Sequence, residues 1–471
     1  MHEHITCPRL IVSALRGGAG KSTVAIGITA ALRNQGKLVA PFKKGPDYID
    51  AGWLYLAAGV SCYNLDTFFI PPEQLVTSFY THTCNCDIAV IEGNRGLFDG
   101  IDIDGKTSTA DIAHTLGAPV ILCLDCTKTT RTCAAVVGGC MAFDQRINIA
   151  GIVLNRVAGK RHESILRQSI EHYCGIPVIG AVPKLTADDF PERHMGLVPT
   201  PEHGWARKAI EAAARIATDY IDLNAILKIA ALANDRPVPD FSPTVPSPIY
   251  CGNDRPKIAV ARDSAFQFYY PDNLEALENA GSDLIFITPL TDNCLPDDID
   301  GLYIGGGFPE THARQLAENK PFRRQVAELA GKGLPIYAEC GGLIYLGKEI
   351  IMDETAYPMC GIFPVSFGIS KKPVGHGYTV SLVDRGNPYF DIGTELKGHE
   401  FRYSRILSWE GNDNDLAFST VRGKGFENKR DGLCRRNVLA TYTHLHALGT
   451  PSWAPAVVKT ALAYRQTKKA G

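Results

Sequence analysis

The glycine-rich stretch RGGAGKST, residues 16–23, constrains the fold of this chain more than any other feature. It follows a short apolar stretch and precedes a segment with helical spacing. In that setting the glycines let backbone N–H groups curl around phosphate oxygens, Lys21 brings a positive charge to them, and Ser22 or Thr23 can bind Mg²⁺. The predicted nucleotide-binding residues of the loop are Arg16, Gly17, Gly18, Gly20, Lys21, Ser22 and Thr23.

The position where such a loop usually has its first glycine holds Leu15, and Arg16 follows it. This variant resembles the branch of P-loop proteins that includes the partition ATPases, dethiobiotin synthetase and the amide-forming corrinoid synthetases. Several members of that branch carry a lysine where Arg16 stands. We therefore expect a P-loop domain of this branch, for which a homodimer is one compatible state.

Apolar segments alternate with helical segments through the first half of the chain. The predicted strands are 9–15, 38–43, 86–93, 118–125, 148–157 and 176–183. Strands that are apolar along nearly their whole length and are separated by helices predict a parallel sheet covered on both faces. The first half is thus expected to be a P-loop α/β domain, like dethiobiotin synthetase.

A stretch rich in Pro, Ser and Asp, residues 241–255, has no periodicity and is the predicted linker. A second α/β series begins after it. We predict a first domain over 1–240, a second over 256–455 and a short basic tail over 456–471.

Charged residues follow two predicted strands of the first domain, where they should lie beside the phosphate loop. The segment 41–53 has mixed charges around Gly-Pro, which suits either a loop that holds a charged substrate near the γ-phosphate or a solvated connection. Its candidate substrate contacts are Lys43, Asp47, Tyr48 and Asp50. Glu92, at the end of another strand, is predicted to meet Mg²⁺ together with Ser22. Asp99 is either a further substrate contact or a turn cap. Asn155 either contacts the base of the nucleotide or satisfies backbone groups.

Cys340 ends a predicted strand in the second domain, and Gly341 follows at once. A strand, a nucleophile, small residues and a helix in this order indicate a nucleophile elbow, and a structural cysteine is the alternative. The glycine turn in LYIGGGFPE could hold an oxyanion through the N–H groups of Gly306 and Gly307, with that of Gly341. A cysteine nucleophile needs a base. The candidate bases are His376, His399, His444 and His446.

Composition excludes some functional classes. The formal net charge is −2 over 471 residues, so neither a nucleic-acid surface nor a polybasic membrane anchor is expected. The chain has neither a signal-peptide pattern nor an apolar run of about 18 residues, and we expect a cytoplasmic protein with reduced cysteines. Cys123 and Cys126 stand at metal-binding spacing, although burial on a strand also explains them, and Cys84 and Cys86 form a second close pair.

Three segments, GGGFPE, YAECGGLIYL and TYTHLH, resemble the oxyanion strand, nucleophile elbow and base segment of class I glutamine amidotransferase domains. With RGGAGKST, PFKKGPDYID, IEGNRGLFDG and GHEFRYS in this order, nearly the whole chain resembles the cobyrinate a,c-diamide synthase family. The resemblance implies that Cys340 takes the glutamine amide and that His444 activates it. Class I domains usually have a glutamate two residues after the base, where this chain has His446, so the third role of the triad is open.

The resemblance also implies a reaction. ATP, with Mg²⁺, would convert a carboxylate of a tetrapyrrole into an acyl phosphate, and ammonia released from glutamine would cross an internal passage to attack it. The substrate would be cobyrinic acid, amidated on its a and c acetates. Hydrogenobyrinate or nickel-sirohydrochlorin are alternatives with the same chemistry, and a non-enzymatic P-loop ATPase switch with a partner-binding second domain is an alternative of another class.

Overall fold

The computed structural model describes residues 4–185, 205–239, 249 and 254–470. The chain divides into two compact units, Met1–Pro243 and Thr244–Gly471. Most of the predicted linker, 241–255, lies outside the described residues.

The first unit is built on a seven-stranded sheet in the order β4-β3-β5-β2-β6-β7-β8, and every pairing in it is parallel. Its strands are β2 (Arg9–Ala14), β3 (Val39–Lys44), β4 (Tyr63–Leu65), β5 (Ile88–Glu92), β6 (Val120–Asp125), β7 (Ile149–Val157) and β8 (Val178–Pro183). All six predicted strands are present. The short β4 was not predicted, and β1 (His4–Ile5) pairs with β9 (Arg236–Pro237) apart from this sheet.

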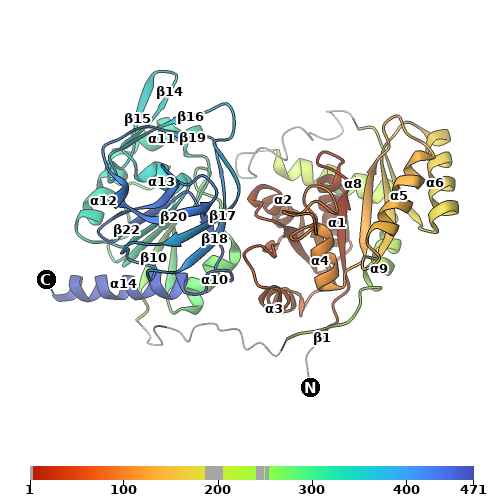
Figure 1. Cartoon of the computed structure of the whole chain (residues 1–471), viewed down its shortest axis with the longest axis horizontal. Coiled ribbons are helices and arrows are strands. Elements are labelled where there is room, and N and C mark those ends of the chain that lie inside the picture. The colour runs from red at the N-terminus through yellow and green to blue at the C-terminus, as the bar shows by residue number, and fades with distance from the viewer. Residues whose placement is uncertain (1–3, 186–204, 240–248, 250–253, 471) are drawn as a thin grey trace. The chain divides into compact units, whose positions relative to one another are not determined.

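Helices cover both faces of this sheet (Figure 1). They are α1 (Lys21–Asn34), α2 (Tyr48–Ala58), α3 (Pro72–Thr83), α4 (Thr109–Leu116), α5 (Thr132–Phe143), α6 (Lys160–Cys174), α8 (Ala206–Tyr220) and α9 (Leu223–Ala230). Leu10 and Val12 of β2 pack with α1, α2, α8 and α9, whereas Ile11 and Ser13 are buried on the opposite face. This burial on both faces is why the strands are apolar along their length.

The second unit has a ten-stranded sheet in the order β11-β10-β12-β13-β22-β21-β20-β17-β18-β23. The first five are parallel: β11 (Asp283–Ile287), β10 (Lys257–Ala261), β12 (Gly301–Ile304), β13 (Ile336–Glu339) and β22 (Val438–Thr441). The others pair antiparallel: β21 (Arg430–Arg435), β20 (Leu416–Arg422), β17 (Gly375–Val383), β18 (Glu395–Arg402) and β23 (His444–Leu445). A four-stranded sheet joins β15 (Thr355–Pro358), β14 (Glu349–Met352), β16 (Val365–Ile369) and β19 (Ser404–Trp409).

Two helical layers enclose the parallel part of this sheet (Figure 1). Ile258 and Val260 of β10 pack with α10 (Pro271–Asn279) and α14 (Trp453–Ala470). The alternate residues Ala259 and Ala261 pack with the helices of the other face, which are α11 (Ala313–Glu318), α12 (Lys320–Gly331) and α13 (Gly341–Leu346). Both units therefore have the predicted α/β architecture.

The predicted basic tail, 456–471, is instead part of α14 over its described residues, 456–470. Trp453, Val457, Val458 and Ala461 recur at helical spacing, and all four are buried in the core that α14 shares with α10. The prediction weighed the basic end of the segment and overlooked this apolar stripe.

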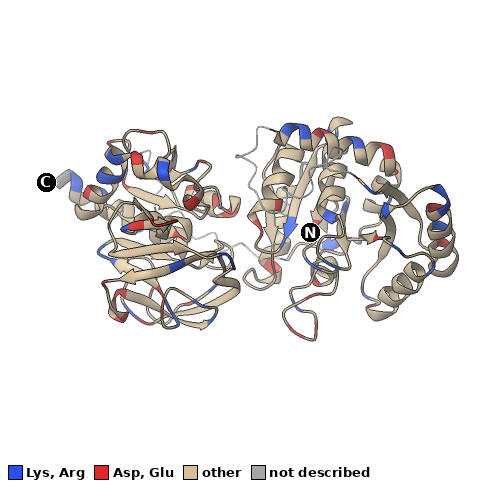
Figure 2. Cartoon of the chain, turned by 90° about the horizontal axis from the view of Figure 1, so that it is seen from above, with Lys and Arg blue, Asp and Glu red and all other residues tan. Residues whose placement is uncertain are grey.

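Basic and acidic residues are interspersed along both units (Figure 2). Among the described residues, no helix combines the length and the apolar character that a membrane crossing requires.

Candidate functional site

The predicted phosphate loop lies between the end of β2 and the start of α1. Gly18 and Gly20 have φ of 71° and 93°, a backbone conformation that favours glycine. A Cβ added at Gly17 or Gly18 would meet nothing within 4 Å, so the loop presents open backbone there. This is the geometry of a loop that wraps a phosphate group with its N–H groups.

Asn155, near the end of β7, supports the phosphate loop through a hydrogen bond. Its side-chain amide donates to the carbonyl oxygen of Ala19 at 2.9 Å, and its Oδ1 accepts the N–H of Arg156 at 2.9 Å. A Cβ on Gly20 would come within 2.1 Å of the Asn155 amide nitrogen. Asn155 therefore satisfies backbone groups, which is the second of the two roles considered for it.

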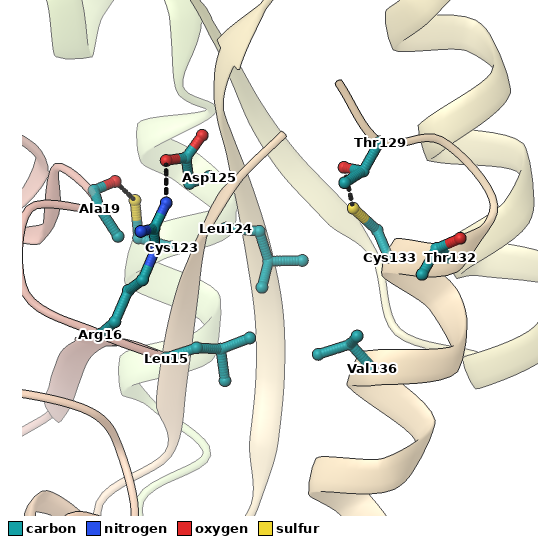
Figure 3. Close-up of a pocket in the computed structure, with 10 residues that line it drawn as sticks. All are labelled: Leu15, Arg16, Ala19, Cys123, Leu124, Asp125, Thr129, Thr132, Cys133 and Val136. Carbon is teal, nitrogen blue, oxygen red and sulfur yellow. Dashed lines mark hydrogen bonds and ion pairs between the residues drawn. The ribbon is translucent and has the colours of Figure 1, made fainter. Parts of the chain in front are cut away.

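Arg16 lies at the rim of a pocket of about 120 Å³, shown in Figure 3. Its side chain is 71% exposed, and its guanidinium donates to Asp125 at 2.9 Å. Arg156 binds the same oxygen of Asp125 at 2.8 Å. Leu15, the residue in place of the usual glycine, contributes an apolar wall of this pocket together with Leu124 and Val136.

Glu92, Ser22 and Lys21 come together at the start of α1. The Ser22 hydroxyl donates to Oε1 of Glu92 at 2.6 Å, and Lys21 Nζ lies 3.8 Å from the same oxygen. The Glu92 side chain is fully buried at the end of β5. Burial, and then repulsion by Asp50, raise the pKa of Glu92 to about 7.

Lys43, on β3, joins the predicted substrate segment to this group. Its ammonium is fully buried and lies 2.7 Å from Asp50, 3.1 Å from Glu92 and 3.9 Å from Asp47. Burial alone would lower the pKa of Lys43, but Asp50 and Glu92 raise it, so the ammonium keeps its charge. β3 and β5 are neighbours in register, with Lys43 paired to Glu92, and this pairing brings the two side chains together.

Asp47 caps the N-terminus of α2 by accepting the N–H of Asp50 at 2.9 Å. Burial, and then Asp50, raise the pKa of Asp47 to about 6. Tyr48 is half-buried and begins the same helix. The exposed Asp99 accepts the N–H of Gly96 at 2.9 Å, which corresponds to the turn-cap alternative.

The residues at the head of α1 fit a Mg²⁺ ion. Glu92 Oε2 is buried and has no hydrogen-bond partner among the described residues, so one carboxylate oxygen remains to be satisfied. Carboxylate and hydroxyl oxygens are the ligands that Mg²⁺ prefers. Ser22 and Glu92 are thus the residues that could hold the ion.

The thiols of the two close cysteine pairs form hydrogen bonds with backbone carbonyl groups. Cys123 and Cys126 are both buried, and their thiols donate to the carbonyls of Ala19 and Leu124, each at 3.4 Å. The thiols of Cys84 and Cys86 donate to carbonyls near the end of α3. Within the described part of the chain, no group of three or more His, Cys, Asp or Glu side chains is arranged to hold a metal ion.

Cys340 occupies a strained turn in the second unit. It lies between β13 and α13 with φ 46° and ψ −94°, a conformation that residues with a Cβ seldom adopt. A Cβ on Gly342, two residues later, would lie 2.4 Å from the carbonyl oxygen of Ile304, so only glycine fits there. This is the geometry of a nucleophile elbow.

The glycine turn after β12 packs against Gly341, the residue after Cys340, and against His444. Gly307 has φ 154°, and its nitrogen would lie 3.0 Å from a Cβ placed on Gly341. A Cβ on Gly306 would lie 2.3 Å from Cε1 of His444. The structure therefore brings the three predicted oxyanion glycines close to Cys340 and to the imidazole of His444.

His444 lies beside Cys340, on β23. Burial alone would lower its pKa, but the neighbouring Cys340 and Glu339 raise it to about 10. Of the other candidate bases, His399 stacks on His444 with ring centroids 4.8 Å apart, and His376 packs on Phe401.

His446 does not occupy the place of the usual triad glutamate. Its Nε2 lies 3.3 Å from Asp272 on α10, and its ring packs on Tyr270. The carboxylate that approaches His444 is Glu339, whose Oε2 lies 3.5 Å from Nδ1. Sequence reasoning missed Glu339, although a single charge at the end of the apolar strand LPIYAE is a signal that could have found it.

Comparison with known proteins gives the family. Residues 10–198 match a "CobQ/CobB/MinD/ParA nucleotide binding domain", and residues 257–452 match a "CobB/CobQ-like glutamine amidotransferase domain". Cobyrinate a,c-diamide synthase of Magnetococcus marinus is 41% identical over 95% of this chain and 96% of its own. The chain belongs to the cobyrinate a,c-diamide synthase family. The enzymes of that name from Dehalococcoides mccartyi and Methanosarcina acetivorans are 40% and 36% identical, over 95% and 98% of this chain and 96% and 97% of theirs.

Proposed function

We propose that this chain is a glutamine-hydrolysing ligase that uses ATP to amidate the a and c acetate side chains of cobyrinic acid. One observation supports this most strongly. The same chain carries a P-loop beside a buried Lys43–Glu92 group and a strained Cys340 beside an imidazole. The first arrangement suits phosphoryl transfer and the second suits release of ammonia from an amide.

The first unit activates the acid. A substrate carboxylate oxygen attacks the γ-phosphorus of ATP, the bond to the bridging oxygen breaks, and an acyl phosphate and ADP form. The loop N–H groups and Lys21 hold the phosphates, and Lys43 neutralises charge that collects near the transferred group. When bound by Ser22 and Glu92, Mg²⁺ would supply positive charge to the phosphate oxygens. Tyr48 contacts the acetate end of the substrate, while Asp47 and Asp50 hold the Lys43 ammonium beside it.

The second unit supplies nitrogen. The sulfur of Cys340 attacks the side-chain amide carbon of glutamine, and the glycines at 306, 307 and 341 face the oxyanion. His444 gives a proton to the departing nitrogen, which leaves as ammonia, and a thioester remains. Water, deprotonated by His444, hydrolyses the thioester to glutamate. Ammonia then displaces phosphate from the acyl phosphate and forms the amide.

A substrate panel tests this function. The purified chain receives ATP, Mg²⁺, glutamine and, separately, cobyrinic acid, hydrogenobyrinic acid or nickel-sirohydrochlorin. We expect two successive amidations of cobyrinic acid by mass spectrometry, with release of glutamate. If only hydrogenobyrinic acid or only nickel-sirohydrochlorin is amidated, that tetrapyrrole is the substrate and the proposal of cobyrinic acid is wrong. ATP hydrolysis without glutamate release would support a P-loop switch instead.

A further inference from the structure

The Glu339 carboxylate accepts hydrogen bonds from three donors, and its side chain is only 1% exposed. Oε1 accepts the hydroxyl of Tyr337 at 3.0 Å and the N–H of Leu445 at 3.1 Å. Oε2 accepts the hydroxyl of Tyr303 at 3.4 Å and lies 3.5 Å from Nδ1 of His444. A buried carboxylate is tolerated where donors surround it in this way.

The two tyrosines act as donors because they keep their protons. Burial, and then the charge of Glu339, raise the pKa of both Tyr303 and Tyr337 well above the usual value. The strand also contributes, because Tyr337 and Glu339 are two residues apart on β13 and share one face. The residue after Glu339 is Cys340, so the nucleophile and this carboxylate have a common rigid support.

His444 is enclosed by a small set of titratable groups. Cys340 faces it from the start of α13 and Glu339 from β13. His399 of β18 is paired with it in register, stacks on its ring and has a pKa held well below the usual value by burial and then by His444. Only Glu339 among these three contributes a carboxylate to the imidazole.

We infer that Glu339 is the positioning residue that completes the Cys340–His444 pair, in place of a glutamate two residues after the base. By accepting the Nδ1 proton, Glu339 fixes the tautomer and leaves Nε2 for exchange of protons with sulfur and glutamine. The imidazolium that forms in each half-reaction is stabilised by the same contact. This inference rests on the proposed glutaminase role of Cys340.

A buried carboxylate elsewhere in the unit offers a matched control. Asp431 also organises the segment before His444, since its oxygens accept the Thr441 hydroxyl at 2.8 Å and the N–H groups of Tyr442 and Thr443 at 3.1 and 3.2 Å. Substitution of Asp431 therefore disturbs the same segment without removing the Nδ1 contact. A role of Glu339 in packing alone would make the two substitutions equivalent.

The experiment measures alkylation of Cys340 by iodoacetamide as a function of pH in the full-length chain, by mass spectrometry of the peptide that contains Cys340. The alkylation rate should change at the pH where His444 loses its proton, because a thiolate beside an imidazolium differs in reactivity from a thiolate beside a neutral imidazole. Glu339→Gln should move that inflection to lower pH by about one unit or more, as for loss of a neighbouring opposite charge. Glutamine-driven amidation should fall by about 100-fold or more, since loss of an orienting carboxylate has large effects on turnover.

Glu339→Asp should recover part of both effects, and Asp431→Asn should keep the wild-type inflection. The inference is overturned if Glu339→Gln keeps the inflection and the rate, or if Asp431→Asn shifts the inflection equally. If Glu339→Gln does not fold, Glu339→Asp is the deciding variant, because its shorter carboxylate should still shift the inflection of the alkylation rate to lower pH than in the wild type. Failure of the wild-type chain to amidate any tetrapyrrole with either glutamine or ammonia, while the inflection still shifts, would reject the proposed function and leave the role of Glu339 intact.

Discussion

The contact between Gly306 and His444 allows a quantitative test of the glutaminase site. In Gly306→Ala, the new Cβ would lie 2.3 Å from Cε1 of His444, whereas ordinary contact begins at 3.4 Å. The imidazole, or the turn that carries residue 306, must therefore move by about 1 Å. A displacement of this size at a reacting group costs about 100-fold in rate. We expect glutamine-driven amidation to fall by about that factor while ammonia-driven amidation stays within about twofold of wild type.

The assay compares the two nitrogen sources under saturating ATP and follows the mass of the tetrapyrrole. Gly301→Ala, at the start of the strand β12 that leads into this turn, is the matched control, because its Cβ would meet its nearest neighbour at an ordinary 3.6 Å. The reasoning is refuted if Gly306→Ala, folded to the same thermal midpoint as Gly301→Ala, keeps a wild-type rate with glutamine. Equal loss with both nitrogen sources would also refute it, since the displacement would then reach beyond His444.

Two further predictions concern the nucleotide site. Because the pKa of Glu92 is raised to about 7, the carboxylate is protonated below that pH, and a cation must displace the proton. The affinity for MgATP in calorimetric titrations should therefore fall by up to about tenfold per pH unit below about pH 7, and Glu92→Gln should remove that slope; a slope that persists in Glu92→Gln contradicts the assignment. Asn155→Ala loses the hydrogen bond to the Ala19 carbonyl that supports the phosphate loop, worth about 1 kcal/mol, so the Kd for ATP should rise about fivefold. An unchanged Kd would show that other contacts hold the loop in place.

Much of the nucleotide site could be predicted because its signals are local. A glycine-rich loop between a strand and a helix commonly binds phosphate. The parallel pairing of β3 with β5 then places Lys43 opposite Glu92, beside this loop. The sequence could not decide between the alternatives for Asp99 and Asn155. Each choice depends on which backbone group lies nearest, and both side chains bind backbone groups.

The second site was predicted in part. The elbow at Cys340 follows from a strand, a cysteine and two glycines in series. Glu339 was missed because the glutamate of class I domains usually comes two residues after the base, at residue 446 here, whereas the carboxylate beside His444 lies at the end of the strand before Cys340. The tail was mispredicted because its basic end concealed the apolar stripe of α14.

The strands between residues 349 and 435 were not predicted either. They pair mostly antiparallel, and several have only one buried face, so they lack the continuous apolar runs that identified the parallel strands. Their contribution to the site nevertheless includes His399, which stacks on His444.

Cys340→Ala offers the most direct test of a ligase that joins an activated acid to ammonia freed at a separate thiol. The variant would be incubated with ATP, Mg²⁺ and cobyrinic acid, once with glutamine and once with an ammonium salt, and the diamide would be measured. The account predicts no product with glutamine and a wild-type rate with ammonium. Full activity of the variant with glutamine, or loss of product with both nitrogen sources in a variant that still binds ATP, would contradict it.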